Sequence, residues 1–454
     1  MIREKGLTLE EEDKKYLWHP YTQMADYLKE KPLVIEEGKG VRLKDTEGRW
    51  YLDGVSSLWV NVHGHGRPEI DSAIEAQLRK VAHSTLLGLA NVPAVRLARR
   101  LVEIAPRGLT KVFYSDNGST AVEVALKMSY QFWQQGLKEF RKKKKFVSFK
   151  NAYHGDTLGC MAVGGIPLFH EIFKPLAFTP RWAESPYCYR CPLGLALPEC
   201  RLECLKGLEE MLSEHSQEIA GLIIEPRVQA AAGMIVQPHG FLKRVGKLCS
   251  YYRVHLIADE VAVGFGRTGT MFACEAEEVK PDFLCLAKGI TGGYLPLAAT
   301  LTTEEVFQGF LSSSQVSKTF YHGHTYTGNP LACAAALANL ELFAAESTLE
   351  KLKEKIKFLK GALAKFYELA HVGDIRQAGL MVGIELVEDK TEKRPYASQK
   401  EIGHKVILES RSRGLIIRPL GDVIVLMPPL AISLPELREM VEIAYESIRV
   451  VTEG

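Results

Sequence analysis

The stretch Ala287-Lys288-Gly289-Ile290-Thr291-Gly292-Gly293 follows the apolar run Phe283-Leu284-Cys285-Leu286, which predicts a buried strand. Lys288 therefore lies where a strand gives way to a glycine-rich turn. A buried lysine is unfavourable unless its amine is paired, neutral or covalently used, and glycines let a backbone approach a ligand closely. Two interpretations fit these residues: a lysine that leaves the strand into solvent, or an amine that forms an imine with an aldehyde in a tight pocket.

The same order, an apolar strand followed by polar or glycine-rich residues, recurs along the middle of the chain. Regular alternation of such strands with helices implies a mostly parallel sheet covered by helices. Ligands of such sheets bind at the carboxyl ends of the strands, where polar candidates follow each run here. We therefore predict an α/β fold with a site at that edge, formed after the apolar runs at 111–114, 146–149, 222–224, 255–258 and 283–286.

Three stretches of the chain differ in pattern. Residues 1–65 hold short predicted strands and glycine turns, and we expect them to supply an arm and strands of a small domain. Residues 66–332 carry the alternating pattern and form the large domain that holds the site. Residues 333–454 hold amphipathic helices, strands such as 381–386 and a final helix near 434–451, which indicates a smaller α+β domain that the N-terminal strands join.

The composition is that of an ordinary globular enzyme. Lys and Arg number 57 against 55 Asp and Glu, so there is no bulk field to attract nucleic acid or an anionic membrane. The basic run 141–145 has no interleaved aromatics and is interpreted as a solvated loop. No run is long and apolar enough to span a bilayer, and no signal peptide is visible. Nine cysteines, an odd number, favour a reducing, cytoplasmic setting with free thiols.

Two groups of residues raise the question of a metal. His63 and His65 lie in a glycine loop with no third ligand nearby in sequence, so hydrogen bonding is the preferred interpretation. The second group is four cysteines whose thiols suit zinc or an iron–sulfur cluster, although their irregular spacing in a proline-containing segment also fits a simple surface insertion. No tightly bound metal is expected at Cys188, Cys191, Cys200 and Cys204.

Four strand ends together describe one cofactor. Gly118-Ser119-Thr120 opens a predicted helix whose N-terminus suits a phosphate. Tyr153 offers an aromatic face to a planar ring, and Asp259 ends a buried strand where a carboxylate pairs with a protonated ring nitrogen. Lys288 supplies an amine for an aldehyde. Phosphate, planar ring, ring nitrogen and aldehyde are the parts of pyridoxal 5′-phosphate.

Two longer segments carry a family resemblance over nearly the whole chain. Asp259–Gly269 (DEVAVGFGRTG) and Ala287–Gly293 resemble the signature of the class III pyridoxal-phosphate aminotransferases of fold type I. Within that family the chain is most similar to the subgroup that converts 8-amino-7-oxononanoate to 7,8-diaminononanoate in biotin synthesis. The markers of the subgroup are Trp18-His19-Pro20-Tyr21 and Arg418-Pro419-Leu420-Gly421.

The resemblance implies a role for each matching residue. Lys288 bonds to the cofactor and then moves the proton, and Asp259 keeps the pyridine nitrogen protonated. The phosphate is held within one chain and also reached by Thr325, beside His324, from a second subunit, which implies a homodimer with shared active sites. The remaining cofactor contacts implied by the resemblance are Gly118 and Ser119 at the phosphate, Tyr153 and Val261 on the ring faces, and Gln229 near the ring hydroxyl.

The substrate side is implied in the same way. Arg418 binds the far carboxylate of the keto acid, while Tyr21, Tyr153 and Gly323 belong to the substrate pocket and Tyr21 also takes part in catalysis. The usual amino donor of the subgroup is S-adenosylmethionine, whose users tend to carry two tryptophans after a Ser-Ser pair. This chain has Leu58-Trp59, an arrangement similar to relatives that use L-lysine. S-adenosylmethionine is the expected donor, with lysine as the alternative.

Two rival functions share the predicted fold. One is another class III ω-amino acid transaminase or an aminomutase, against which the Trp18–Tyr21 element and Arg418 count. The other is a binding or regulatory protein on a degenerate transaminase scaffold, which would be expected to lack Lys288 or Asp259, and both are present.

Overall fold

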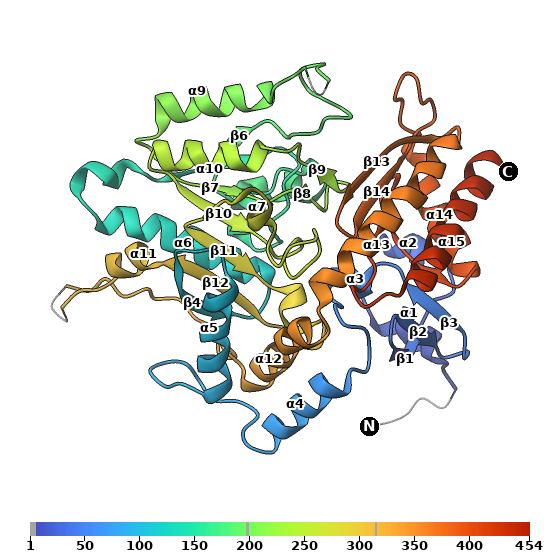
Figure 1. Ribbon diagram of the computed structural model, residues 1–454, viewed down its shortest axis with the longest axis horizontal. Coiled ribbons are helices and arrows are strands. Elements are labelled where there is room, and N and C mark those ends of the chain that lie inside the picture. The colour runs from blue at the N-terminus through green and yellow to red at the C-terminus, as the bar shows by residue number, and fades with distance from the viewer. Residues whose placement is uncertain (1–5, 197–198, 314–315) are drawn as a thin grey trace.

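A seven-stranded sheet forms the centre of the large domain (Figure 1). The computed structural model describes residues 6–196, 199–313 and 316–454. The strand order is β4-β12-β11-β10-β7-β5-β6, and within this sheet β12 is antiparallel to both neighbours while the other pairs are parallel. The predicted mostly parallel sheet is confirmed. Its strands are β4 (Leu109–Ser115), β5 (Lys145–Phe149), β6 (Arg181–Ala183), β7 (Ile219–Ile224), β10 (His255–Asp259), β11 (Phe283–Leu286) and β12 (Ala298–Thr303).

Helices cover both faces of this sheet because successive side chains of each strand point to opposite sides. On β11, Phe283 and Cys285 pack in the core shared with α6 (Gly118–Gln135), whereas Leu284 and Leu286 pack in the core shared with α5, α9, α10 and α12. Strands that are buried on both faces consist of consecutive apolar residues, and the sequence shows this pattern in these strands. The helices are α4 (Pro68–Leu78), α5 (Val92–Ile104), α9 (Lys206–His215), α10 (Phe241–Tyr251), α11 (Glu304–Gly309) and α12 (Pro330–Ala345).

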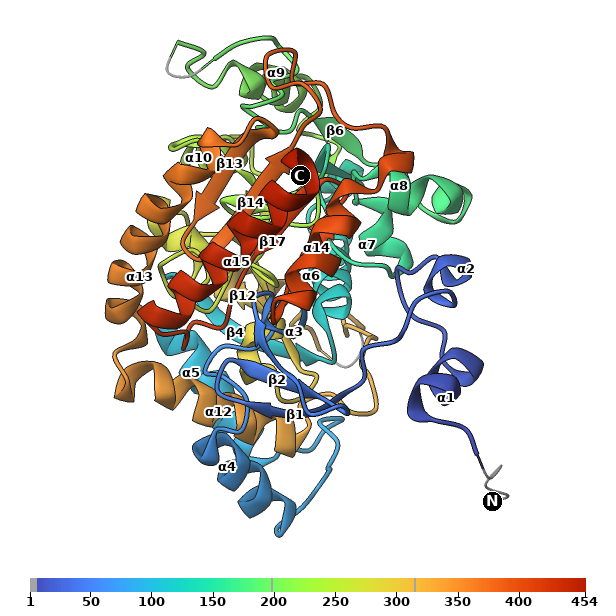
Figure 2. The ribbon, with the colours of Figure 1, turned by 90° about the vertical axis from the view of Figure 1, so that its right-hand side faces the viewer.

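Segments from both ends of the chain lie side by side on the other side of the molecule (Figures 1 and 2). One sheet, β1-β2-β3-β15, joins three N-terminal strands to a C-terminal one, and β15 runs parallel to β3. A second sheet, β13-β14-β17-β16, is antiparallel. These strands are β1 (Ile35–Lys39), β2 (Arg42–Asp45), β3 (Trp50–Asp53), β13 (Val372–Ala378), β14 (Met381–Leu386), β15 (Leu415–Ile416), β16 (Arg418–Leu420) and β17 (Val423–Leu426).

Three helices accompany these strands: α13 (Thr348–Leu363), α14 (Ile402–Ser412) and α15 (Leu434–Glu453). The last begins with a reciprocal cap, in which Ser433 and Glu436 each accept a hydrogen bond from the backbone N–H of the other. Short helices α1 (Leu9–Tyr16) and α2 (Met24–Tyr27) precede β1. No helix within the described residues combines the length and apolar character that a bilayer crossing requires.

A buried arginine ties the large domain to both end segments. Arg267 is 1% exposed and donates hydrogen bonds to Ser56 Oγ at 3.2 Å, to the Asn61 carbonyl at 2.7 Å and to the Pro428 carbonyl at 2.8 Å. Burial lowers the pKa of its guanidinium to about 10, so it remains charged at neutral pH. Three acceptors from two distant segments thus depend on one donor group, and an unpaired buried acceptor is unfavourable by about 1–3 kcal/mol.

Candidate active site

A cavity of about 660 Å³ opens at the carboxyl ends of the parallel strands, where the sequence predicted it. Residues at or shortly after the ends of β4, β5, β7, β10 and β11 all contribute to its wall. The predicted residues in the lining are Gly118, Ser119, Tyr153, Asp259, Val261, Lys288 and Trp59. The sequence-based interpretation of Lys288 as a pocket lysine, and not as one leaving into solvent, is the one the structure supports.

The N-terminus of α6 forms one end of the cavity. Asn117 caps the helix by accepting a hydrogen bond from the Thr120 N–H at 3.1 Å. The N–H groups of Gly118 and Ser119 lie before the first residue that can bond within the helix, so they remain available to an anion, which the helix dipole also favours. A Cβ at position 118 would lie 2.6 Å from Val261 Cγ1, so only glycine allows this close approach.

Gly155 stands against the same helix turn. Its φ of +118° is a conformation that residues with a side chain rarely adopt, and a Cβ there would lie 2.0 Å from Ser119 Oγ. The Ser119 hydroxyl in turn accepts a hydrogen bond from the Asp156 N–H at 3.3 Å. Gly155 therefore fixes where the Ser119 hydroxyl lies relative to the helix N-terminus.

The wall of the cavity also holds a buried carboxyl group. Asp259 Oδ2 lies 2.7 Å from Nδ1 of His154, and its Oδ1 accepts a hydrogen bond from the Val261 N–H at 3.1 Å. Asp259 is 4% exposed and His154 3%. These contacts fix the orientation of the Asp259 carboxyl group, which can pair with a cationic ring nitrogen in the cavity.

Lys288 presents its amine to the cavity from the turn after β11. Its φ is +47°, in the left-handed region that is unfavourable for a residue with a side chain. The side chain stays partly accessible through the cavity, while protein surrounds it elsewhere. Burial lowers the pKa of the amine, although the charges of Asp259 and Glu225 oppose that shift. A lowered pKa increases the fraction of neutral amine, which is the nucleophilic form.

Trp59 covers the Lys288 amine from the side of the small domain. The Nζ atom lies 4.9 Å from the centroid of the indole ring. The ring is placed by four successive residues, 56–59, that all have left-handed backbone angles, which is strained for side-chain-bearing residues. The turn leaves Trp59 only 6% exposed, with its buried indole N–H without a partner among the described residues, and turns Leu58 outward at 49% exposed.

Glu225 is a second buried carboxyl group in the wall. It accepts hydrogen bonds from the Tyr153 N–H at 3.0 Å and the Ala230 N–H at 2.9 Å. Burial raises its pKa to about 7, with the charge of His154 opposing the rise. Glu225 therefore positions the backbone of Tyr153, and its raised pKa makes protonation easier than for an exposed carboxyl group.

At the entrance, a hydroxyl-carboxylate network joins the N-terminal arm to the cavity wall. Tyr21 Oη donates to Asp156 at 2.6 Å and lies 3.0 Å from Tyr153 Oη, which donates to Asp156 at 2.9 Å. Burial, and then the bond to Asp156, raises the pKa of Tyr21 to about 12, while the charge of Arg418 opposes the rise. The charge of Arg418 thus reaches Tyr21, although the two residues are far apart in sequence.

Other predicted residues lie outside the cavity lining. Gln229, in β8 (Val228–Gln229), is buried beside the cavity with its amide engaged: it accepts from Ser185 Oγ at 2.6 Å and donates to the Lys150 carbonyl at 2.9 Å. His324 contacts Asp116, a lining residue, at 2.8 Å, and Gly323 and Thr325 are exposed.

The two histidines of the glycine loop have partners in the fold. His63 Nε2 lies 3.1 Å from the Asn339 carbonyl, and His65 Nε2 lies 3.1 Å from Asp53. These contacts agree with the hydrogen-bonding interpretation of the pair.

Sequence reasoning gave no role to His154, Glu225 or Asp156. Glu225 directly follows β7, and His154 and Asp156 lie in the loop after β5, so the rule that placed Asp259 and Lys288 at strand ends also pointed to them. What the sequence could not supply was their direction: His154 turns inward to Asp259, whereas Asp156 faces the entrance and Tyr21.

Comparisons with known proteins agree with this geometry. The family model described as aminotransferase class-III matches residues 24–448. The chain is 54% identical over 448 residues, 98% of each chain, to a protein of Geobacter sulfurreducens named adenosylmethionine-8-amino-7-oxononanoate aminotransferase. A crystal structure of a protein of that name from Methanocaldococcus jannaschii is similar with TM-score 0.92 and 49% identity, covering 97% of this chain and 98% of the other.

A more distant structure was solved with a cofactor form. It is an omega transaminase from Pseudomonas jessenii in complex with PMP, with TM-score 0.93 and 32% identity over 98% of this chain and 99% of that one. PMP is the amino form of pyridoxal phosphate. The described residues fit that group: a glycine-spaced helix N-terminus for the phosphate, Asp259 for the ring nitrogen and the Lys288 amine for the aldehyde.

The phosphate end of this cavity gives a direct test. We expect Gly155→Ala to displace the Ser119 hydroxyl and to weaken pyridoxal phosphate binding at least tenfold, since one hydrogen bond to a charged group contributes roughly 1.5–3 kcal/mol. Dissociation constants from fluorescence titration of the cofactor-free protein would measure this. Gly207→Ala is the matched control because a Cβ there meets no atom within 4 Å, and equal affinities of the two variants would contradict the assignment.

Proposed function

Because this chain belongs to the class III aminotransferase family, we propose that it transfers an amino group to 8-amino-7-oxononanoate, forming 7,8-diaminononanoate in biotin synthesis. The chain is a pyridoxal-phosphate-dependent aminotransferase of fold type I. The full-length identity to relatives named for this substrate is the observation that carries the proposal.

The cofactor, when bound, supplies an electron-withdrawing ring that stabilises negative charge next to the transferred nitrogen. The residues of the chain prepare that chemistry. Asp259 would present its carboxylate to the ring nitrogen, and His154, whose Nδ1 lies 2.7 Å from Oδ2 of Asp259, fixes the orientation of that carboxylate. Val261 lines the cavity next to Gly118, and the Gly118 and Ser119 N–H groups would hold the phosphate.

Lys288 is the group that moves the proton. Its amine has a lowered pKa because of burial, so it accepts and returns a proton at pH values where a solvent-exposed lysine stays charged. The Trp59 ring above it excludes water from one side of the amine. Its strained backbone angle holds it in one orientation at the end of β11.

Arg418 and Tyr21 supply substrate recognition. A guanidinium binds a carboxylate through two parallel hydrogen bonds, and Arg418 lies near enough to Tyr21 for its charge to oppose the rise in the tyrosine pKa. The Tyr21–Tyr153–Asp156 network joins this region to the cavity. An amino-keto acid with a distant carboxylate can therefore extend from the Lys288 amine past Tyr153 to Arg418.

The donor we propose is S-adenosylmethionine, in keeping with the names of the relatives, and L-lysine is the alternative. The position that bears on the choice is Leu58, which is half exposed, while Trp59 is turned inward over Lys288. An aromatic face attracts a cation such as a sulfonium by about 0.5–2 kcal/mol, which leucine does not provide.

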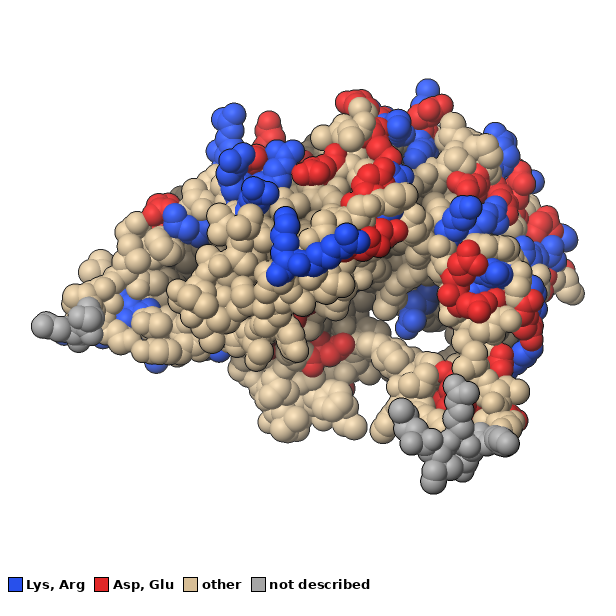
Figure 3. Space-filling view, turned by 90° about the horizontal axis from the view of Figure 1, so that it is seen from below, with Lys and Arg blue, Asp and Glu red and all other residues tan. Residues whose placement is uncertain are grey.

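We also propose a homodimer with shared active sites. Large apolar side chains are exposed on two segments of the chain. Seen from below, the surface of the molecule has wide areas without charged side chains (Figure 3). Thr325, expected to reach a phosphate, is exposed and outside the cavity of its own chain. A second copy would cover the exposed residues, which are Leu87, Leu89, Val92, Val95, Val316, Tyr321 and Tyr326.

The reaction itself is the first test. Mixed with each donor separately, the aldehyde form of the enzyme should be converted to the amino form by S-adenosylmethionine, and subsequent addition of 8-amino-7-oxononanoate should restore it and yield 7,8-diaminononanoate. The Lys288→Ala variant is the negative control. It should undergo neither conversion because it lacks the amine that moves the proton. Absorbance spectra and mass spectrometry of the product measure both steps. Conversion by L-lysine and not by S-adenosylmethionine would identify lysine as the amino donor. If 8-amino-7-oxononanoate did not react with the amino form, the proposed substrate would be wrong.

Arg418 gives the second test. We expect Arg418→Ala to keep the cofactor spectrum and to raise the KM for the keto acid at least tenfold, because losing one partner of a desolvated charge pair is unfavourable by roughly 2–5 kcal/mol. The control is Arg413→Ala, which removes a surface arginine paired with Glu409 in the same domain. Steady-state kinetics would show an unchanged KM if Arg418 lay outside the pocket.

A further inference from the structure

A long excursion between β6 and α9 carries four of the nine cysteines. From residue 184 to residue 202 the described backbone has no helix or strand, and a single 3-10 turn at Glu203–Leu205 precedes α9. Loops of this length without secondary structure are uncommon in compact domains unless something else orders them. The cysteines fall in two pairs, Cys188-x2-Cys191 and Cys200-x3-Cys204. Although the two spacings differ, each one taken alone lies within the C-x2–4-C range of structural zinc sites.

The fold brings all four thiols to one small hollow. Cys188, Cys191, Cys200 and Cys204 line a space of about 20 Å³, enough for one small ion or one water but too small for an iron–sulfur cluster. Two residues with left-handed backbone angles, Arg201 and Leu202, turn the chain between the second pair. Most of the remaining wall is apolar, formed by Pro186, Pro192, Leu193, Leu195, Leu202 and Pro238.

The hollow can be reached from the surface. Cys188 is exposed, and Cys191, Cys200 and Cys204 are partly exposed. A divalent cation bound by such thiols displaces their protons and balances the negative charge of the sulfurs.

The four cysteines line the hollow. Among the described residues, no three His, Cys, Asp or Glu side chains already form a metal-binding group. A cysteine sulfur changes position by rotation about the Cα–Cβ bond between staggered rotamers. Binding of an ion at the hollow would therefore include rotation of the cysteine side chains toward one point.

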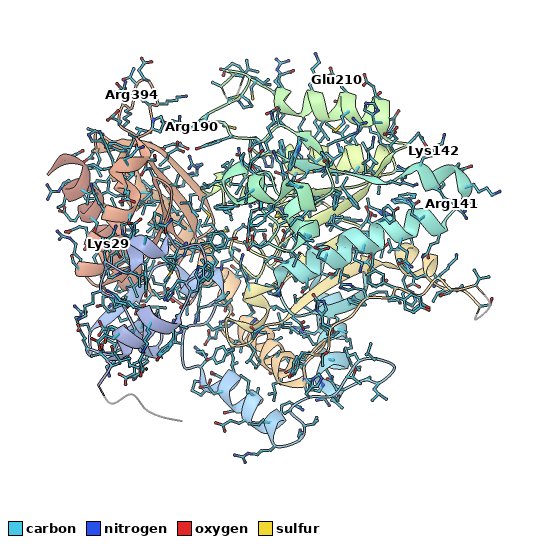
Figure 4. The ribbon with its side chains drawn as sticks, turned by 180° about the vertical axis from the view of Figure 1, so that it is seen from behind. Lys29, Arg141, Lys142, Arg190, Glu210 and Arg394 are labelled. Atoms are coloured by element: carbon cyan, nitrogen blue, oxygen red, sulfur yellow. The ribbon has the colours of Figure 1, made fainter. Side chains whose placement is uncertain are left out.

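The same loop fastens the two domains together. Tyr187 Oη donates to Glu385 of β14, Arg190 Nε donates to Glu385 Oε1 at 2.7 Å, and Arg190 Nη1 donates to the Lys393 carbonyl at 2.7 Å. Figure 4 shows Arg190 close to the domain that carries Arg394. On the cavity side of the loop, Ser185 donates to the buried Gln229. An ordered cysteine loop thus holds both the domain contact and a residue beside the active site.

We propose that Cys188, Cys191, Cys200 and Cys204 bind one zinc ion as a structural tetrathiolate site. Zinc suits four sulfur ligands in tetrahedral geometry and closes a structural site completely. Its role is to hold Cys188, Cys191, Cys200 and Cys204 at one hollow and so to keep Tyr187 and Arg190 against Glu385. This proposal departs from the expectation drawn from cysteine spacing alone, because the spacing did not show that the two pairs face one hollow.

The test is elemental analysis of the intact enzyme, expressed in zinc-supplemented medium and purified without a metal-affinity step. We expect about one zinc per chain by mass spectrometry of the metal content. Cys191→Ala and Cys204→Ala should reduce it at least fivefold and lower the unfolding temperature. The matched control is Cys249→Ala, a buried cysteine in α10, which should keep its zinc.

Separate outcomes distinguish this site from the active site. Cofactor content and the Lys288-dependent half-reaction do not require zinc at the loop. The measured zinc content therefore tests the zinc proposal independently of the proposed aminotransferase function. Three results would each overturn the proposal. They are less than a tenth of a zinc ion per chain in the wild type, iron in place of zinc, and equal zinc contents in the loop variants and the wild type.

Discussion

The structure depends on placing an amine and a carboxylate in a water-poor cavity on neighbouring parallel strands. Asp259 ends β10 and Lys288 follows β11, and these strands are hydrogen-bonded neighbours, so their ends share one edge of the sheet. Neither group is stable there as an isolated charge. Asp259 is stabilised by His154 and a backbone N–H, while Lys288 has a lowered pKa and an aromatic cover. The seven-stranded sheet, buried on both faces, provides the rigid support for this arrangement.

The second requirement is that segments from both ends of the chain reach this edge. Tyr21 comes from the N-terminal arm, Trp59 from the strained turn after β3, and Arg418 from the C-terminal β16. Arg267 holds the turn around Trp59 and the C-terminal segment after β17 to the large domain through acceptors at residues 56, 61 and 428. Strain of this kind persists only where the surrounding contacts compensate for it, and the buried guanidinium supplies three of those contacts at the strained turn and its neighbours.

The cysteine loop extends the same principle to the domain boundary. Glu385 is the meeting point of Tyr187, Arg190 and Arg376, and Arg376 also donates to the Gly233 carbonyl at 2.8 Å. These nearby cations lower the pKa of Glu385 against the effect of its burial, so it remains a carboxylate. A loop that supplies two of the partners of one buried carboxylate has to be well ordered itself, and four thiols around a single hollow provide the means.

The sequence by itself determined the periodic part of the molecule. Apolar runs predicted the strands β5, β10 and β11. The position of Lys288 after such a run indicated a pocket lysine, because the carboxyl ends of parallel strands share one edge of the sheet regardless of the conformation of the loops. Only the tertiary structure decided how the loops turn: His154 toward Asp259, Asp156 toward Tyr21, Trp59 inward and Leu58 outward. Those directions depend on left-handed backbone angles and long-range contacts such as those of Arg267, which no local pattern encodes. The same holds for the cysteines, whose spacing is local but whose common hollow exists only in the folded chain.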